Sequence, residues 1–224
     1  MSNQPSSYKY LDIIASFFVG ILIVSNIASC AKIVDMGFSL FGIPLVFDGG
    51  TLLFPFVYIL GDVLTEIYGF KTARRVIWTG FAAMLLTALT FFILGLLPAE
   101  SFWEAEAGND AYNVILGGMS SGGIVIASLA AYLAGEFSNA AVLSKIKEKM
   151  KGRMLPVRTI GSSLIGQLLD TMIFVLIASA AGVFGWEIFW SLVLTNYLLK
   201  CGIEAVMTPF TYLLVKFIKG TSKN

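Results

Sequence analysis

RVIWTGFAAMLLTALTFFILGLL, at residues 75–97, carries a single charged side chain, at its first position. A transmembrane helix needs about 20 mostly apolar residues to cross the hydrocarbon core of a bilayer, and this stretch reaches that length. Its polar residues do not alternate strictly with apolar ones, so it predicts a helix rather than a strand of a membrane barrel. The chain is therefore expected to be a membrane protein.

The composition of the whole chain supports a membrane location. Hydrophobic residues make up 57% of the 224 residues and charged residues only 13%, whereas soluble domains contain about 25% charged residues. A soluble fold of this size cannot bury so much apolar surface in one core. The absence of histidine removes histidine-based catalysis, proton relays and metal sites, and we expect no catalytic residue, metal or cofactor. The net charge of +1 gives no reason to expect a nucleic-acid partner, and Cys30 and Cys201 lie in apolar segments, where a disulfide framework is not expected.

Five further stretches have the length and apolarity of membrane spans, and each ends at a polar or glycine-rich break. The six predicted spans are Leu11–Val34, Gly50–Ile67, Arg75–Leu97, Gly118–Leu143, Thr159–Phe184 and Ile188–Val215. They predict an all-α integral membrane protein with one transmembrane domain over residues 1–224. The acidic and aromatic stretch Glu100–Leu116 is predicted to be an interfacial outer segment rather than a seventh span.

The basic residues predict the orientation of these spans. Thirteen of the 15 lysines and arginines lie in the two termini and in the loops after the second and fourth spans. The loops of the opposite face carry acids and no base; these acids are Asp35, Asp48, Glu100, Glu104, Glu106, Asp110 and Glu187. Because cytoplasmic loops are enriched in lysine and arginine, both termini are predicted to be cytoplasmic. Arg158 counts among the loop bases, whereas Lys32 and Lys200 lie within predicted spans.

Polar side chains inside the spans point to a binding site. A charge at the centre of a membrane helix costs about 2.5–3.5 kcal/mol on insertion scales, yet five of the six spans carry such residues. The candidate substrate-binding residues are Asn26, Asp62, Glu66, Glu136, Asn139, Gln167, Asp170, Asn196, Lys200 and Glu204. Several share a helix face through spacings of three or four residues. We expect them to line a polar cavity in the interior of the bundle.

A structural interpretation of these residues stays open beside the functional one. Buried ion pairs and hydrogen bonds also hold membrane helices together, and Lys200 with Glu204 fits such a pair. Glu66 fits a position at the cytoplasmic interface near Lys71 and Arg74. Two prolines, at positions 55 and 209, lie inside predicted spans and are expected to kink them.

Known intramembrane enzymes and channels fit the sequence poorly. A rhomboid-type protease needs a serine paired with a histidine, and presenilin-like proteases show Tyr-Asp and Gly-x-Gly-Asp motifs, which are absent. No Walker motif is present. The mixture of carboxylate, amide and ammonium groups suits a shaped organic solute better than an ion filter.

Three ordered motifs resemble a known family. They are DVLTEIYG at 62–69 followed by Ala73-Arg74-Arg75, GEFSN at 135–139, and GQLLD at 166–170 after Arg158. Asn26, Lys32, Lys200 and Pro209 fit the same pattern. Together, over residues 11 to 219, they resemble the queuosine-precursor transporter family, also called the vitamin uptake transporter family.

The resemblance implies uptake of 7-cyano-7-deazaguanine, with its 7-aminomethyl relative as a second substrate, for queuosine modification of tRNA. It implies a bacterial cytoplasmic (inner) membrane protein whose six-helix fold is similar to the substrate-binding subunits of energy-coupling-factor transporters. Its partners are then a purine-like small molecule and the lipid bilayer, and a homo-oligomer is compatible with the sequence. One carboxylate accepts both the ring N–H and the exocyclic amine of a deazaguanine, and Phe174 and Tyr197 are candidates for stacking on its ring. The alternatives are a binding subunit of a multi-component uptake system and an intramembrane enzyme of unrecognised type.

Overall fold

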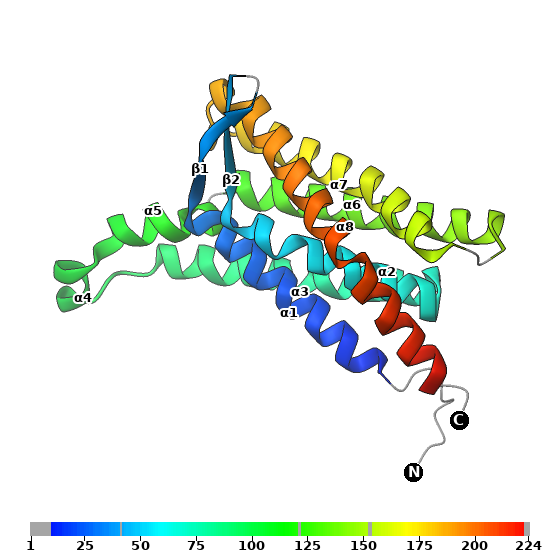
Figure 1. Cartoon of the computed structure of the whole chain (residues 1–224). Coiled ribbons are helices and arrows are strands. Elements are labelled where there is room, and N and C mark those ends of the chain that lie inside the picture. The colour runs from blue at the N-terminus through cyan, green and yellow to red at the C-terminus, as the bar shows by residue number, and fades with distance from the viewer. Residues whose placement is uncertain (1–9, 41, 121, 152–153, 222–224) are drawn as a thin grey trace, which may run out of the picture.

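Helices make up most of the chain in the computed structural model, which describes residues 10–40, 42–120, 122–151 and 154–221. They run roughly side by side in an elongated bundle, with a β-hairpin at one end (Figure 1). The elements are α1 Leu11–Ala31, β1 Ile33–Leu40, β2 Ile43–Asp48, η2 Gly49–Leu52, α2 Phe54–Tyr68, α3 Phe70–Leu96, α4 Ser101–Glu106, α5 Gly108–Ser120, α6 Gly122–Lys149, α7 Leu155–Ala180, η3 Trp186–Ile188 and α8 Phe189–Thr221. Residues 1–9 and 222–224, which carry the two predicted cytoplasmic termini, lie outside the described residues.

Five helices in the described part of the chain have the length and apolarity needed to cross a membrane. They are α1, α3, α7, the Ile126–Lys149 part of α6, and α8 together with η3 up to Ile218. No more than 44% of any of their most apolar windows is buried, so much of their apolar surface points outward. Exposed side chains such as Phe17, Phe92 and Phe210 are therefore suited to contact lipid tails. The chain is a multi-pass membrane protein, as its composition predicts.

The second predicted span corresponds to η2 and α2 and differs from the others. α2 has 15 residues and is roughly 22 Å long, shorter than the hydrocarbon core of about 30 Å. Ten of its residues are buried, and it packs against α1, α3, α6 and α8. The element is an interior helix of the bundle, and its role as a sixth span stays a prediction.

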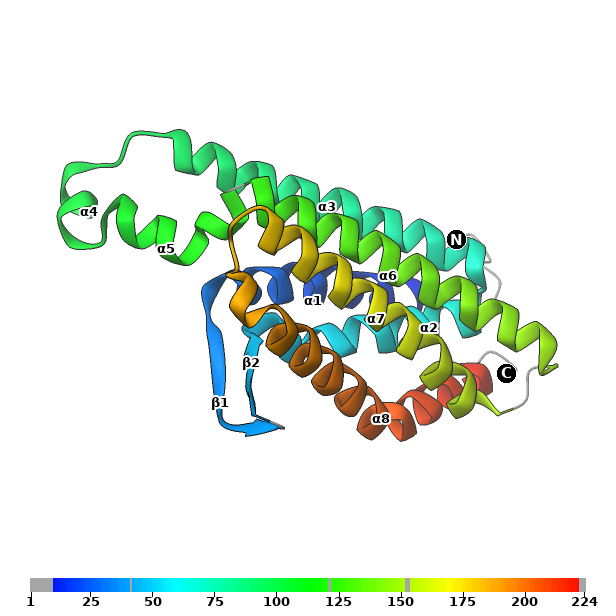
Figure 2. The ribbon, with the colours of Figure 1, turned by 90° about the horizontal axis from the view of Figure 1, so that it is seen from above.

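The two prolines behave differently from each other. Pro55 lies in the first turn of α2, where the missing N–H has no partner to lose, so the expected kink at this position is wrong. Pro209 lies inside α8, where it removes one backbone hydrogen bond of the helix. The helix changes direction along its length (Figure 2).

A β-hairpin follows α1 that the sequence analysis did not predict. α1 ends at Ala31, and Lys32 has an extended backbone and an exposed side chain instead of lying within a span. The two antiparallel strands pair from Ile33 opposite Asp48, and Gly42 between them has a positive φ of 80°, which glycine adopts readily. The β2 strand packs against α8. An all-helical fold is therefore correct for the membrane part but incomplete for the chain.

Two short helices form the segment after α3. α4 has six residues and α5 thirteen, both too short to cross a bilayer. The Glu100 carboxylate accepts hydrogen bonds from the backbone N–H groups of Phe102 and Trp103 and caps α4. These helices extend beyond the rest of the bundle beside the end of α3 (Figure 2), and the Tyr112 hydroxyl donates to the Phe91 carbonyl over 2.6 Å. The interfacial position of this segment stays a prediction.

The closest helix pair is α6 with α7. Gly135 and Gly166 face each other where these helices cross, because a Cβ at Gly166 would lie 2.9 Å from the Gly135 carbonyl oxygen. Glycine at this point lets the two backbones approach closely. α6 continues beyond the predicted end at residue 143 to Lys149, and α7 begins four residues before the predicted start. The lysine-rich connection is therefore short, and much of it is helical.

Apolar packing on either side of these helices forms two core clusters. One joins α1, α2 and α3 and contains Phe18, Leu22 and Val63. The other joins α6, α7 and α8 and contains Val175 and Leu192.

Candidate functional site

The ten predicted site residues are all buried, each with at most 4% of its surface exposed. They come from α1, α2, α6, α7 and α8. Their contacts do not join them into one network: six form a central group, Glu66 belongs to an inner ion pair, Asn196 belongs to an outer group, and two, Asn26 and Glu136, stand outside these contacts. The burial supports a polar interior, while the division separates residues that fasten helices from residues that are available to a ligand.

The central group links α2, α6, α7 and α8. Asn139 Nδ2 donates to Asp62 Oδ1 over 2.9 Å, and the Ser163 hydroxyl donates to Asn139 Oδ1 over 3.4 Å. Lys200 Nζ lies 2.8 Å from Asp170 Oδ2 and 4.7 Å from the centre of the Phe54 ring, a cation–π distance.

Gln167 and Glu204 complete this group. Gln167 Nε2 donates to Glu204 Oε2, and the Cys201 thiol donates to Gln167 Oε1 over 3.1 Å. The expected pair of Lys200 with Glu204 is therefore wrong. The two residues are neighbours on α8, but each has its partner on α7.

The inner pair lies at the end of α2. Arg158 Nη1 contacts Glu66 Oε2 at 2.7 Å, and both side chains are at most 2% exposed. Lys147 Nζ lies 3.6 Å from the other Glu66 oxygen and donates to the Glu66 carbonyl over 2.6 Å. Glu66 is thus buried and paired with these two bases, whereas Lys71 and Arg74 are exposed.

Arg158 was predicted to lie in a cytoplasmic loop, and this prediction is wrong. It lies in the first turn of α7 and is 1% exposed. Ser162 lies four residues further along and is fully buried, so the two residues share one face of that helix. In the sequence, this spacing was the feature that indicated a buried position for Arg158.

The outer group surrounds Asp48, which was predicted to be a loop acid and is instead 3% exposed. Its Oδ1 accepts from the Ser29 hydroxyl at 2.5 Å and from the Gly50 N–H at 3.1 Å. Its Oδ2 accepts from the Thr51 hydroxyl at 2.9 Å and from Asn196 Nδ2 at 3.0 Å. Asn196 therefore belongs to this group, which fastens α1, β2, η2 and α8 to one another.

Asn26 lies apart from these contacts. Its Nδ2 donates to the Leu22 carbonyl of its own helix over 2.9 Å, the local hydrogen bond that a polar residue forms inside a membrane helix. Both predicted stacking residues have other contacts, and their stacking on a substrate stays a prediction. Phe174 packs against Phe184 with their ring centres 6.0 Å apart, and the half-buried Tyr197 donates to the Leu164 carbonyl.

Glu136 is the exception among the buried acids. In the part of the chain that the structure describes, neither carboxylate oxygen has a hydrogen-bond partner, although the residue is 1% exposed. It faces α2 at Gly61, where an added Cβ would lie 2.9 Å from Glu136 Oε2. Burying a polar group without a partner costs about 1–3 kcal/mol.

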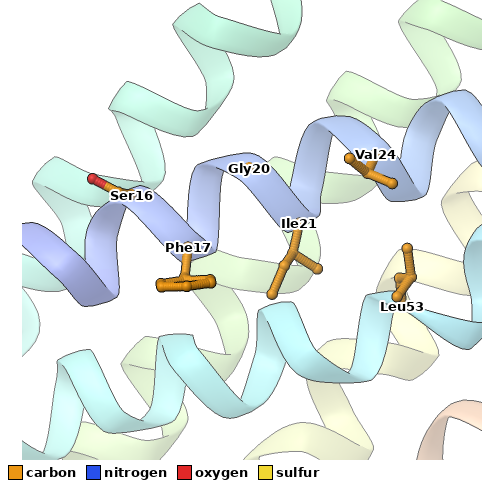
Figure 3. A pocket seen from close by; sticks show the side chains of 6 residues that line it. All are labelled: Ser16, Phe17, Gly20, Ile21, Val24 and Leu53. Carbon is orange, nitrogen blue, oxygen red and sulfur yellow. The ribbon is translucent and has the colours of Figure 1, made fainter.

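A small cavity and a larger groove differ in size and in the polarity of the side chains that line them. A small cavity beside Ser163, Cys201 and Glu204 has a volume of about 10 Å³, the space of roughly one water molecule. A larger groove of about 520 Å³ runs along the outer face of α1 (Figure 3). Its lining is almost entirely apolar; the residues are Ser16, Phe17, Gly20, Ile21, Val24 and Leu53. This groove suits a lipid tail, whereas the polar interior suits a hydrogen-bonding solute.

Within the described ranges, no three cysteine, aspartate or glutamate side chains are arranged to hold a metal ion. The interior instead offers acceptors and donors on four helices. Such a set has the hydrogen-bonding groups that sites for small polar molecules use.

Comparison with known proteins identifies relatives over most of the chain. Residues 48–214 match the model of a family described as "Putative vitamin uptake transporter". The chain is 28% identical over 176 residues to a Bacillus subtilis protein named "Probable queuosine precursor transporter", covering 78% of this chain and 74% of the relative. It is 24% identical over 206 residues to the Escherichia coli "Queuosine precursor transporter", covering 91% and 85%. A Haemophilus influenzae protein with the same name as the first is 26% identical over 160 residues, covering 70% and 63%. No solved structure matches significantly, so the expected likeness to energy-coupling-factor subunits stays a prediction.

Proposed function

Because the chain belongs to the vitamin uptake transporter family, we propose that it carries the queuosine precursor 7-cyano-7-deazaguanine, and its 7-aminomethyl relative, across the bacterial cytoplasmic membrane. The family consists of transporters rather than enzymes, which agrees with the absence of recognised catalytic motifs. The names of three relatives support a queuosine precursor as the substrate. The structural observation that carries the proposal is a buried set of acceptors and donors with one unpaired carboxylate.

The central group has the chemistry that a deazaguanine requires. The base presents two adjacent donors, the ring N–H and the exocyclic amine, and a carbonyl oxygen that accepts. Carboxylates are the best acceptors for such a donor pair, and amide or ammonium groups serve the carbonyl. The proposed site therefore comprises Asp62, Glu136, Asn139, Gln167, Asp170, Lys200 and Glu204.

Transport requires these helices to separate. The cavity beside Glu204 is about 10 Å³, whereas pockets for small organic ligands are roughly 300–1,000 Å³. Transporters bind near the middle of the membrane and open alternately to either side. The Asp48 group and the Glu66–Arg158 pair, near the two ends of α2, are the contacts that such opening would break in turn.

Reconstituted transport tests the proposed function. The purified protein in liposomes is expected to take up labelled 7-cyano-7-deazaguanine, and unlabelled riboflavin is expected not to compete. Uptake with and without a pH gradient separates proton coupling from facilitated diffusion. Binding without any uptake would contradict the proposal and favour a subunit that needs a separate energising complex.

The orientation of the chain is tested separately. With both termini in the cytoplasm, α4 faces the outside, and Glu106 in that helix is exposed. A Glu106→Cys protein is expected to react with a membrane-impermeant thiol reagent added to intact cells. The parent protein is the control, since its two cysteines lie in helices α1 and α8 and are partly buried. Labelling only after cell lysis would reverse the orientation.

A further inference from the structure

The buried acids of the bundle differ in the hydrogen bonds and ion pairs that their carboxylate oxygens already accept. Asp48, Asp62, Glu66, Asp170 and Glu204 each accept at least one hydrogen bond or ion pair from a neighbouring helix or turn. Among the described residues, Glu136 accepts none. Glu204 keeps one oxygen without a partner, but its other oxygen is held by Gln167. Glu136 alone in this set offers two unoccupied acceptors.

The surroundings of Glu136 combine aromatic side chains with further acids, since Asp170 and Glu204 lie within electrostatic range of its carboxylate. Gly61 presents bare backbone to the carboxylate, and a Cβ there would also lie 3.7 Å from the Phe18 ring. Tyr132 lies one helical turn before Glu136, and its ring centre is 6.5 Å from that of Phe18. The Tyr132 hydroxyl donates to the Ile77 carbonyl over 2.8 Å, which fixes the ring in place. Two rings and an open backbone beside a carboxylate are suited to a planar base with a donor edge.

We infer that Glu136 is the specificity-determining residue of the site, and that its two oxygens bind the ring N–H and the exocyclic amine of the deazaguanine. The inference rests on the proposed function. Two parallel hydrogen bonds to one carboxylate form a strong and directional contact. They also give hydrogen-bond partners to Glu136, which has none among the described residues.

The exocyclic amine then decides which bases bind. An analogue that carries hydrogen at this position leaves one carboxylate oxygen without a partner, at a cost of about 1–3 kcal/mol. This corresponds to a loss of affinity of roughly tenfold to hundredfold. An analogue with a carbonyl at this position places two acceptors opposite each other and is expected to bind more weakly still.

The Glu136→Gln substitution tests the inference by exchanging one acceptor for a donor. The amide oxygen still accepts from the ring N–H, but its NH₂ group now opposes the exocyclic amine. The variant is expected to reverse the preference of the wild type and bind the 2-oxo analogue, 7-cyano-7-deazaxanthine, more tightly than 7-cyano-7-deazaguanine. The measurement is the ratio of the two dissociation constants on purified protein in detergent.

Two control variants make the result interpretable. Glu204→Gln removes a second buried carboxylate of the proposed site and is expected to weaken both ligands without reversing their order. Glu148→Gln changes an exposed acid on the same helix as Glu136 and is expected to leave both constants unchanged. Thermal unfolding of each variant shows whether it is folded.

The possible outcomes separate the inference from the proposed function. An unchanged ratio in folded Glu136→Gln protein would overturn the inference, and so would a reversal in Glu204→Gln alone. A role of Glu136 restricted to proton coupling would also give an unchanged ratio. If the wild type binds neither base, the proposed function itself fails, whatever the variants do.

Discussion

Asp48 and Glu136 are carboxylates buried to nearly the same degree, 3% and 1% exposed, yet their surroundings are opposite. Asp48 accepts four hydrogen bonds, whereas Glu136 has no partner in the described part of the chain. Almost all buried polar groups in folded proteins are hydrogen-bonded. Asp48, whose oxygens are hydrogen-bonded, therefore stabilises the fold. Glu136, whose oxygens have no partner among the described residues, is the better candidate to bind a ligand.

Their positions along α2 extend this comparison. Asp48 lies shortly before α2 and joins it to α1 and α8 through side-chain contacts, and Glu66 in the last turn of α2 is held by Arg158 of α7. Glu136 faces the same helix between these two points, at Gly61. α2 is thus fastened at both ends, with the unpaired acid between. The substitutions below are ordered from the largest to the smallest loss of stability that is expected if α2 is fastened at both ends.

Removing Arg158 is expected to have the largest effect. Loss of one partner of a buried ion pair typically costs about 3–5 kcal/mol, and Lys147, which lies 3.6 Å from the other Glu66 oxygen and is partly exposed, compensates only part of the remaining charge. The Arg158→Met protein is therefore expected to unfold at a much lower temperature in detergent and to accumulate poorly in membranes. Arg75→Met, at an exposed position of α3, is the matched control. Equal unfolding temperatures for the two variants would show that the inner pair does not fasten α2.

Removing the Asp48 carboxylate tests the outer end. Asp48→Ala removes the acceptor that Ser29, Thr51 and Asn196 share. The two hydroxyls keep second acceptors, the Ser25 carbonyl and Asn196 Oδ1, but the Asn196 amide loses the acceptor of its Nδ2, and an unsatisfied buried group costs about 1–3 kcal/mol. We expect a loss of at least about 2 kcal/mol, measured by thermal or denaturant unfolding. Asp35→Ala in the same hairpin is the control, since Asp35 is exposed and, among the described residues, accepts only from the nearby Gly37 N–H. A loss no greater than that of the control would contradict the structural role of Asp48.

A smaller effect is expected from crowding the helix pair beside the central group. A Cβ at Gly166 would lie 2.8 Å from the Asn139 Cβ and 2.9 Å from the Gly135 carbonyl oxygen. Gly166→Ala must push α6 and α7 apart, at a cost of about 1–3 kcal/mol. Gly202→Ala in α8 meets no atom within 4 Å and is expected to gain up to about 1 kcal/mol from helix propensity. A stable Gly166→Ala protein would show that the crossing tolerates a wider spacing.

The burial of the polar residues was predictable because it depends on local properties. Apolar runs of span length and the high cost of charges in lipid can be read from the sequence alone, and all ten candidates are buried. Their pairing was not predictable, because it depends on how each helix is rotated against its neighbours. Lys200 and Glu204 are four residues apart, yet they contact Asp170 and Gln167 of α7.

The ends of the spans were the least predictable parts. Residues 33–48 are rich in apolar and β-branched side chains, so their start extends the run of α1 and hides the hairpin. Asp48 and Arg158 stand at the edges of apolar runs, where a loop residue and a buried residue have the same sequence context. What separates them is contact with distant segments, such as Asn196 for Asp48 and Glu66 for Arg158.

The smallest loss of stability is expected at Glu136. Replacing this acid with glutamine exchanges one buried polar group without partners for another, and a neutral amide costs less to bury than an ionised carboxylate. The unfolding temperature of Glu136→Gln is therefore expected to equal or exceed that of the wild type, while uptake of 7-cyano-7-deazaguanine falls at least about tenfold. Asp48→Asn gives the contrast: its NH₂ group opposes donors that the carboxylate accepted, so its stability falls. A destabilised Glu136→Gln protein would mean that Glu136, like Asp48, is held by the fold rather than kept for a ligand.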